Sequence, residues 1–354
     1  TLTRWRPLDE RPSGVCKVAP TKLPWANILA PPGHRSTGAS GLLRRSVGRV
    51  VRRTSDGAKM NKADLAARHR ISDGRKFRLR DVDPADTAGL NIEKDDAREL
   101  LADSLKDLRK LQERLYAEGK WAVLMVLQAM DAAGKDSAIE HVMTGINPQG
   151  CDVRSFKQPG PVELQHDFLW RHVIALPPRG KIVIHNRSHY EEVLVVRVHP
   201  EILENQAIPS ALVDDDFWKR RFKDIRAFER HLANSGTLVL KFFLHISKDE
   251  QARRFLDRID EEDKNWKFSF GDLEERKLWN KYMDAYEDMI RNTARDYAPW
   301  HVIPANNKWY ARMVISSVLS EALERLDPQF PEVGDDERRR MKEARATLAK
   351  EAKG

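Results

Sequence analysis

The sequence predicts an α/β protein in which a parallel sheet of five strands is covered by helices on both faces. The first observation behind this prediction is that apolar runs of strand length alternate with longer stretches in which apolar residues recur at helical spacing. The second is that polar and charged residues follow the ends of these runs. Alternating strands and helices are joined by right-handed crossovers into a parallel sheet, and ligands bind beyond the carboxyl ends of its strands. The residues directly after each strand are therefore the candidates for function.

The elements can be predicted in order along the chain. A first helix is expected over residues 95–117, where leucines recur at helical spacing and form one apolar stripe. These leucines are Leu101, Leu105, Leu108, Leu111 and Leu115. The first strand is expected in the apolar run that begins at Trp121, and the other four are expected at Cys151–Phe156, Lys181–His185, Thr237–Ile246 and His301–Pro304. Further helices are expected at Val162–Leu176, Asp214–Ala233, Asp249–Arg258, Leu278–Arg295 and Trp309–Leu326.

The first strand leads into a loop with the layout of a phosphate-binding site. The run Trp121–Gln128 is followed by small residues, then by Gly134 and Lys135, and then by a segment with helical character. In such loops, backbone N–H groups and a helix N-terminus hold phosphate oxygens while the Lys adds a positive charge. The match to the pattern G-x-x-x-x-G-K-[ST] is imperfect, because Ala129 replaces the first Gly and Asp136 replaces the hydroxyl residue. On these residues alone, a simple tight turn remains an alternative.

Cations and an amide follow the next two strands. Arg154 and Lys157 stand at the end of the second strand, and Asn186 and Arg187 follow the third. In many P-loop enzymes an Asp at the end of the third strand helps to hold Mg²⁺. Asn186 occupies that position here, so Asp131, in the loop after the first strand, is the carboxylate that remains to attract the metal. Mg²⁺ tolerates a single protein carboxylate, because it keeps several waters and takes other ligands from phosphate. The alternative for the segment after the third strand is a polar turn without a function.

Residues 253–277 have the composition of a mobile lid over an anionic ligand. Basic and acidic side chains crowd this segment, and aromatic residues alternate through Trp266–Gly271. Such a segment brings cations over a polyanion and excludes water when it closes. A solvated face of mixed charge is the alternative. The cations of the segment are Arg253, Arg254, Arg258, Lys264, Lys267, Arg276 and Lys277.

The net charge of +8 belongs to the amino-terminal part of the chain. Residues 1–59 contain 12 Lys and Arg against 3 Asp and Glu, a balance of +9, so the rest of the chain carries −1. This part is rich in proline and glycine and has no sustained apolar period, which predicts a disordered basic extension. Because Met60 begins a segment of balanced composition, we expect the extension to have no folded role. A transit peptide and a basic arm that binds nucleic acid are alternatives.

Residues 60–330 are expected to form the catalytic domain, and residues 331–354 a charged helix or tail. No apolar stretch approaches the ~18 residues needed to span a bilayer, so no membrane association is expected. Cys16 and Cys151 lie far apart in sequence, which argues against a disulfide framework and fits a reducing, cytoplasmic compartment.

Five motifs in one order along residues 70–326 resemble those of polyphosphate kinase family 2. They are Gln128–Ser137 (QAMDAAGKDS), Asn147–Lys157 (NPQGCDVRSFK), His185–His199 (HNRSHYEEVLVVRVH), Asp263–Ser269 (DKNWKFS) and Ala298–Trp300 (APW). The similarity covers nearly the whole chain after the basic extension. Within the family, the Asn-Arg-Ser-x-Tyr-Glu-Glu form resembles the branch that accepts nucleoside monophosphates as well as diphosphates.

The resemblance implies reversible, Mg²⁺-dependent phosphoryl transfer between inorganic polyphosphate and a purine nucleotide, on the fold of P-loop nucleotide kinases with a helical lid. By this resemblance Asp131 holds Mg²⁺, Lys135 binds the transferring group, and Asn186 and Arg187 lie beside the acceptor phosphate. The other residues expected to bind phosphate or nucleotide are Ala132, Ala133, Gly134, Asp136, Ser137, Arg154, Lys157, Arg258, Lys264, Lys267 and Asp272. A homodimer or homotetramer is expected, with no need of nucleic acid.

Two other functions remain open. An ATP-dependent kinase of a nucleoside monophosphate or small metabolite would use the same fold. The sequence has more candidate cations than one triphosphate needs, which favours polyphosphate as the substrate. A nucleic-acid-binding protein with a relict phosphate loop would act through the basic extension, but the neutral body and the intact Asp131 and Lys135 argue against it. The preference among AMP, ADP and GDP, the favoured direction, the polyphosphate chain length and the oligomeric state are left open.

Overall fold

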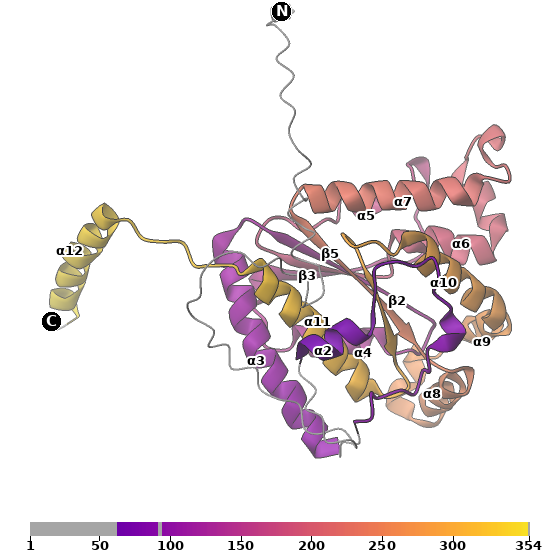
Figure 1. Cartoon of the computed structure of the whole chain (residues 1–354), viewed down its shortest axis with the longest axis horizontal. Helices are drawn as coiled ribbons and strands as arrows, with labels where there is room; N and C mark the ends of the chain where they lie inside the picture. Colours follow the sequence, from indigo (N-terminus) through magenta and orange to yellow (C-terminus); the bar gives the residue numbers. More distant parts are fainter. Residues whose placement is uncertain (1–61, 91–93, 353–354) are drawn as a thin grey trace, which may run out of the picture.

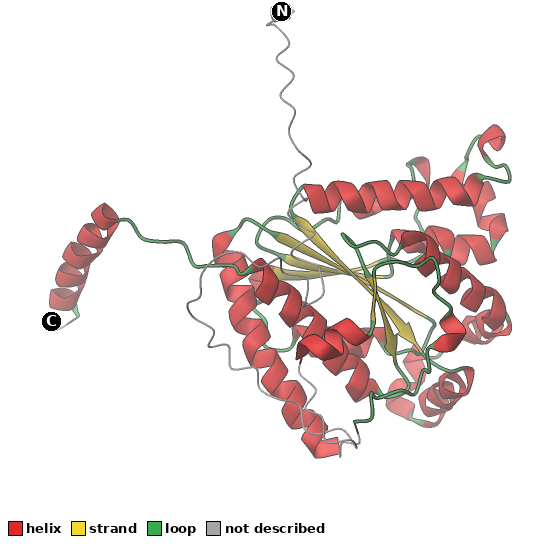
Figure 2. Ribbon diagram, in the orientation of Figure 1, coloured by secondary structure: helices red, strands yellow, loops and turns green. Residues whose placement is uncertain are grey.

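The computed structural model describes residues 62–90 and 94–352, so the expected basic extension at residues 1–59 lies outside the described residues. A six-stranded, mostly parallel sheet forms the centre of the protein, and helices pack on both of its faces (Figures 1 and 2). The predicted α/β class is therefore confirmed.

The strands lie in the order β1-β6-β5-β2-β4-β3. The five parallel strands are β2 (Ala122–Ala129), β3 (Cys151–Ser155), β4 (Ile182–Asn186), β5 (Thr237–His245) and β6 (Trp300–Pro304). β2 lies in the apolar run that begins at Trp121, and the other four strands begin and end within one residue of their predicted bounds. The predicted total of five was one too low, because β1 (Arg70–Ile71) pairs antiparallel with β6 at the edge of the sheet. A strand of two residues is too short to show a period in the sequence.

Two layers of helices cover the sheet. On one face α11 (Lys308–Leu326) packs against α2 (Lys62–Arg68), α3 (Lys94–Glu118) and α4 (Lys135–Met143). On the other face α7 (Phe217–Asn234) packs against β5 and α10 (Trp279–Thr293). This division follows from right-handed crossovers, because the chain moves from β2 towards β3 on one side and from β4 back to β5 and β6 on the other.

The predicted helix Val162–Leu176 is wrong. The structure has only two short turns there, η3 (Glu163–Gln165) and α5 (Trp170–Val173), separated by His166 in an extended conformation. The Asp167 carboxylate accepts a hydrogen bond from the Leu169 N–H at 2.9 Å and starts a new turn. Local side-chain to backbone bonds of this kind compete with a continuous helix. The other short turns are η1 (Leu79–Asp81), η2 (Pro148–Gly150), η4 (His189–Val193), α6 (Val195–Val198), η5 (Pro200–Gln206) and η6 (Ser210–Leu212).

The centre of the core is formed by β2 and β5, which are buried along their whole length. Their sequences are nearly continuous apolar runs, as expected of parallel strands covered on both faces. A charged exception is Lys241 in β5, which is fully buried and donates to Glu229 Oε2 (2.7 Å), Tyr190 Oη (2.9 Å) and Thr293 O (3.0 Å). Burial lowers the pKa of Lys241, against the opposing influence of the Glu229 carboxylate.

After β5 the chain forms α8 (Lys248–Asp260), η7 (Glu262–Lys267) and α9 (Phe270–Lys277), which contain the segment predicted as a lid. The last helix, α12 (Asp335–Glu351), is exposed along its length and lies apart from the sheet in Figure 1. Within residues 62–90 and 94–352, no helix combines the length and the apolar character that a membrane span requires.

Candidate active site

The loop after β2 is shaped to present backbone N–H groups. β2 ends at Ala129 and α4 begins at Lys135. Between them, Gly134 has φ 100° and Ala132 has φ 61°, both in the left-handed region that favours glycine. The turn leads directly onto α4, whose first N–H groups have no carbonyl partner within the helix and are available to an anion.

Lys135 places its ammonium group against this loop. Its Nζ donates to Ala129 O at 2.9 Å and to Met130 O at 3.3 Å, and the residue is only 9% exposed. Burial lowers the pKa of Lys135, while the nearby Asp131 carboxylate acts in the opposite direction. The cation is therefore held in one place beside the backbone of the loop.

The end of β4 brings an amide and a guanidinium group to the same loop, because β4 pairs with β2. Asn186 Nδ2 donates to Asp136 Oδ1 at 2.8 Å, and Arg187 Nη2 pairs with Asp131 Oδ1 at 2.8 Å. Burial opposes the charged form of Arg187, but the carboxylates of Glu191 and Asp131 outweigh this effect and raise the pKa of Arg187. Arg187 therefore remains a fixed cation at the junction of the two strands.

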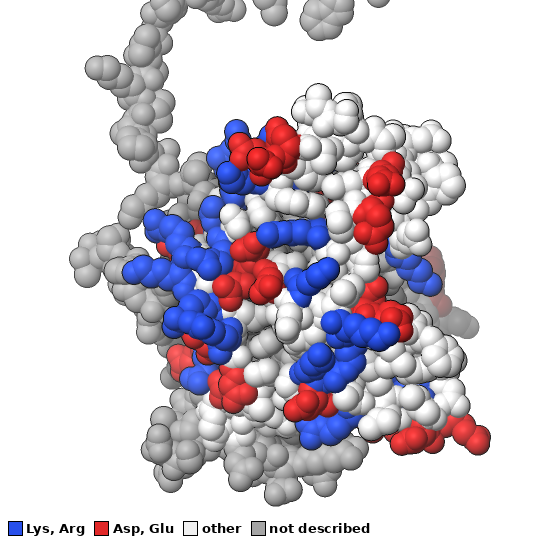
Figure 3. Space-filling model, turned by 90° about the vertical axis from the view of Figure 1, so that its right-hand side faces the viewer, with Lys and Arg blue, Asp and Glu red and all other residues white. Residues whose placement is uncertain are grey.

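These residues line a pocket of about 290 Å³ at the carboxyl end of the sheet. Twelve of its lining residues were predicted to act in the site. They are Asp131, Ala132, Ala133, Gly134, Lys135, Asp136, Ser137, Asn186, Arg187, Arg258, Lys264 and Lys267. Among the residues that the structure describes, the lining has seven Lys or Arg side chains against three Asp, a surplus of positive charge that suits a polyanion. On the face seen in Figure 3, Lys and Arg side chains are interspersed with Asp and Glu.

The segment predicted as a lid contributes four of the pocket's cations, Arg254, Arg258, Lys264 and Lys267. Arg258 Nη1 pairs with Asp272 Oδ2 at 3.3 Å and donates to Lys267 O at 3.0 Å, which ties α8 to the segment after it. The Lys267 ammonium lies 4.9 Å from the centre of the Trp266 ring. Burial raises the pKa of Asp272, and the negative charge of Asp131 adds to this effect. Asp272 therefore lies within electrostatic reach of the phosphate loop, although it does not line the pocket.

Besides Asp272, two of the residues predicted to bind phosphate or nucleotide, Arg154 and Lys157, lie outside this pocket. Arg154 pairs with Asp152 at 2.6 Å on the edge strand β3. Lys157 lines a neighbouring cleft of about 650 Å³, which also includes Arg187 and Phe156. The structure thus separates Arg154 from the phosphate loop, while Lys157 belongs to a second space that meets the first at Arg187.

Three residues that line the phosphate-loop pocket were not assigned to the site from the sequence, namely Arg254, Asp257 and Lys308. Lys308 follows β6 in the same way that Lys135 follows β2, so the rule that functional residues follow strands could have found it. Arg254 was visible only as one cation in a charged segment. Its side chain is 5% exposed and donates to loop carbonyls, a role that no sequence pattern indicates.

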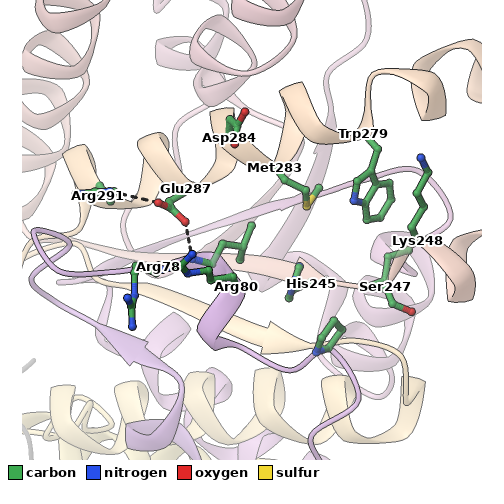
Figure 4. Close-up of a pocket in the computed structure, with 13 residues that line it drawn as sticks. Arg78, Arg80, His245, Ser247, Lys248, Trp279, Met283, Asp284, Glu287 and Arg291 are labelled. Atoms are coloured by element: carbon green, nitrogen blue, oxygen red, sulfur yellow. Dashed lines mark hydrogen bonds and ion pairs between the residues drawn. The ribbon is translucent and has the colours of Figure 1, made fainter.

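A third hollow, of about 510 Å³, lies between residues 78–84, the end of β5 and α10 (Figure 4). Its Glu287 accepts hydrogen bonds from Arg291 at 3.2 Å and from the Leu79 N–H at 2.7 Å. Trp279 contributes an apolar wall. This hollow has no loop of backbone N–H groups and part of its charge is paired internally, so the phosphate-loop pocket is the better candidate for an active site.

The oxygen atoms around the phosphate loop fit Mg²⁺. Asp131 and Asp136 supply carboxylates, and Asn186 Oδ1 is buried without a hydrogen-bond partner among the described residues. Hard divalent cations take oxygen ligands of this kind. In the part of the chain that the structure describes, no group of three or more His, Cys, Asp or Glu is arranged to hold a metal by itself. Phosphate oxygens and water would have to complete the coordination.

Comparison with known proteins agrees with this geometry. The family model described as Polyphosphate kinase 2 (PPK2) matches residues 91–331. An ADP-polyphosphate phosphotransferase of Rhodopseudomonas palustris is 52% identical over 253 residues, which are 71% of this chain and 88% of the relative. An AMP/ADP-polyphosphate phosphotransferase of Meiothermus ruber is 49% identical over 265 residues, which are 75% of this chain and 95% of the relative.

Solved structures give the same result for the fold. The crystal structure of polyphosphate kinase 2 from Arthrobacter aurescens superimposes with a TM-score of 0.73 at 40% sequence identity, and the match covers 81% of this chain and 96% of that one. Together with the family match over residues 91–331, this similarity identifies the chain as a member of the polyphosphate kinase 2 family.

Proposed function

We propose that this enzyme transfers a phosphoryl group reversibly between inorganic polyphosphate and AMP or ADP. The observation that carries the proposal is the phosphate-loop pocket, with seven cationic side chains against three carboxylates, in a chain of the polyphosphate kinase 2 family. The relatives named above act on ADP, or on AMP and ADP, with polyphosphate. In the direction of ATP synthesis the enzyme is a transferase that uses polyphosphate as the phosphoryl donor.

The phosphoryl donor and the acceptor bind in the two adjoining spaces. Polyphosphate binds on the phosphate loop beneath the lid, where Lys135, Arg258 and Lys267 supply positive charge. The nucleotide occupies the larger cleft, where Phe156 offers an aromatic surface to the base. Arg187 lines both spaces, so it lies where the acceptor phosphate meets the end of the polyphosphate chain.

Phosphoryl transfer needs little covalent chemistry from the protein, and positioning and charge neutralisation provide most of the acceleration. The N–H groups at the start of α4 and the Lys135 ammonium orient the oxygens of the terminal phosphoryl group. Arg187 neutralises charge on the group as it passes between the two spaces. Asp131 holds Arg187 in place through their 2.8 Å ion pair. Lid closure excludes water, which would otherwise compete as the acceptor.

Mg²⁺ is proposed as the metal, held by Asp131 with Asp136 and Asn186 nearby. When bound, Mg²⁺ withdraws negative charge from the phosphate oxygens. We further propose a cytoplasmic enzyme that assembles as a homodimer or homotetramer and accepts AMP as well as ADP, with GDP as a further acceptor to be tested. Asp272 and Lys264 are proposed to help close the lid over the bound phosphates.

The test is an assay of purified protein with polyphosphate, Mg²⁺ and, separately, AMP, ADP and GDP. ADP and ATP are the expected products from AMP and ADP, and removal of Mg²⁺ with a chelator should stop the reaction. Failure to form any nucleotide product with polyphosphate, combined with ATP-dependent phosphorylation of AMP, would instead identify an ordinary nucleotide kinase. Binding of nucleic acid without either activity would favour a binding protein.

A further inference from the structure

The phosphate loop can hold an anion only if its carbonyl oxygens point away from the pocket, because their partial negative charge repels phosphate. All six carbonyl groups from Ala129 to Gly134 accept a hydrogen bond from a side chain. Lys135 donates to the first two carbonyls, and the Ser137 hydroxyl donates to the last one. The remaining three, at residues 131–133, are the middle of the loop, where the backbone has to present its N–H groups.

These three middle carbonyls are all held by α8, the helix that carries the lid. Gln251 Nε2 donates to the carbonyl of residue 131 at 3.0 Å. Arg254 Nη1 donates to the carbonyls of residues 132 and 133 at 3.0 and 2.8 Å. Gln251 and Arg254 lie three residues apart on α8, so they project from one face of the helix.

Arg254 uses every one of its five N–H donors. Besides the two bonds to the phosphate loop, its Nη2 donates to Ala305 O at 2.6 Å and Asn306 O at 2.9 Å, and its Nε donates to Glu250 at 2.7 Å. The side chain is 5% exposed. One planar group thus connects the loops that follow β2 and β6 to the helix that follows β5. A lysine cannot reproduce this, because its three donors radiate from a single point.

The same helix also leads into the lid. One turn beyond Arg254, Arg258 lines the pocket and pairs with Asp272 of α9 at 3.3 Å. Arg276, at the other end of α9, donates to Gln251 Oε1 at 3.0 Å. The side chains that fix the phosphate loop are therefore bonded in turn to the lid.

We propose that Arg254, supported by Gln251, is a positioning residue that aligns the phosphate loop with the lid and so determines how tightly the polyphosphate donor binds. This inference rests on the proposed function. Arg254 acts through the backbone of residues 132 and 133, so its loss misplaces the N–H groups without removing a charge that the nucleotide needs. The expected effect is on the donor rather than on the acceptor.

The test compares Arg254→Lys with Arg253→Lys. Arg253 is the neighbouring residue on α8 and pairs with the same Glu250, at 2.8 Å, but its side chain is 68% exposed and does not line the pocket. Arg254→Lys should raise the KM for polyphosphate by about tenfold or more, since small misplacements of binding groups have effects of this size. It should change the KM for ADP less than about twofold, and Arg253→Lys should leave both values within about twofold, as is usual for an exposed pair.

A second measurement separates positioning from folding and from turnover. Tripolyphosphate binding by calorimetry, in the presence of Mg²⁺, should weaken by a similar factor in Arg254→Lys. Because this assay needs no nucleotide product, it reports on Arg254 even if the proposed reaction is wrong. Should Arg254→Lys fail to fold, Gln251→Met replaces it, with a severalfold loss of tripolyphosphate affinity expected. Unchanged tripolyphosphate affinity in the folded variant, or an equal rise in the KM values for ADP and for polyphosphate, would overturn the proposal.

Discussion

At the scale of single residues, the candidate site is a set of charges that are held in place by backbone groups and by one another. Lys135 is fixed by two carbonyls of the loop that it follows, and Arg187 is fixed by Asp131. Each of these contacts keeps a cation next to the position of the phosphate without cancelling the surplus of positive charge in the pocket. Fixed charges of this kind stabilise a transition state without reorganising during the reaction.

Lys135→Ala should reduce kcat by a factor of about 100 to 1000, because the loss of one preorganised contact to the transition state costs roughly 2.7–4 kcal/mol. Its fold should survive, as judged by circular dichroism. Lys110→Ala, which removes an exposed lysine of α3, is the control and should have wild-type activity. Retention of more than about a tenth of the wild-type kcat by a folded Lys135→Ala variant would contradict this role.

The pH dependence of stability should include a contribution from His199. Its Nδ1 and Nε2 lie 3.1 Å from Glu201 and 3.0 Å from Glu275. Burial opposes the charged imidazole, but hydrogen bonds to Glu275 and Glu201 outweigh this effect and raise the pKa of His199 above 6.5. The stabilisation is therefore fully present below about pH 6.5 and is lost as the pH rises through the higher pKa of the folded state.

In a thermal unfolding series, His199→Gln should lower Tm at pH 6 and have a smaller effect at pH 8. The difference in the free energy of unfolding should not exceed about 1 kcal/mol, because the pair is partly exposed. An effect on Tm that is equal at both pH values would show that the ion pairs of His199 do not contribute.

At the scale of elements, the site depends on side chains buried in the core as well as on those at the ends of the strands. Directly after Arg187, η4 is anchored by Tyr190, whose hydroxyl donates to the fully buried Glu229 of α7 at 2.6 Å. Lys241 of β5 completes this buried group and links the sheet, η4 and α7. The group therefore supports the segment from which Arg187 reaches the pocket.

Lys241→Met should lower the free energy of unfolding by roughly 3–5 kcal/mol, because it leaves the Glu229 carboxylate buried and uncompensated. The double variant Lys241→Met with Glu229→Gln should recover part of this loss. Urea unfolding of the two variants and the wild type measures both effects. A single and a double variant that are equally unstable would mean that lost packing, rather than the unpaired charge, dominates.

The lid should act on turnover without stabilising the fold. Lys267→Ala should lower kcat/KM, with a larger effect at low salt, because an open lid meets its polyanion through water before it closes. Its Tm should stay close to that of the wild type, since an exposed charge contributes only about 0–1 kcal/mol. Arg258→Ala should impair turnover as well, and it also removes the bonds to Asp272 and Lys267 O.

Steady-state kinetics at low and at physiological salt distinguishes a lid that closes over the substrate from an exposed charged surface that has no role in turnover. Unchanged kcat and KM in both lid variants at every salt concentration would show that these cations do not cover the substrate. Lys277→Ala, which removes an exposed lysine paired with Glu274 at the end of α9, is a suitable control.

At the scale of the whole molecule, residues from 131 to 308 come together in one pocket, because the carboxyl ends of β2, β4, β5 and β6 meet at one edge of the sheet. Among residues 62–90 and 94–352, the first to line the pocket is Asp131. Of the elements that precede it, α2 and α3 pack against α11 on one face of the sheet.

Deletion of residues 1–59 should leave the phosphorylation of ADP near the wild-type rate, since every described residue that lines the pocket is retained. The kinetic constants of the truncated and the complete chain, measured with the same polyphosphate, test this expectation. A severalfold rise in the KM for polyphosphate would show that the basic segment is a binding arm for the substrate.

The sequence by itself determined the fold class, the bounds of four parallel strands to within one residue and, through the motifs that resemble the family, twelve of the residues that line the pocket. It could do so because buried parallel strands are continuous apolar runs, and because functional residues follow their carboxyl ends. It failed where local chemistry competes with periodicity, as in the segment that Asp167 divides into two turns, and where a strand has only two residues.

Only the tertiary structure decided which cations share a space. Arg154 and Lys157 are three positions apart in the sequence. Arg154 nevertheless pairs with Asp152 at the sheet edge, whereas Lys157 lines the second cleft. Arg254 looks like any surface cation in the sequence, but its side chain is buried. Its guanidinium group donates five hydrogen bonds, to the loops after β2 and β6 and to Glu250 of α8. Such convergence joins residues that are more than a hundred positions apart, so no local pattern in the chain can reveal it.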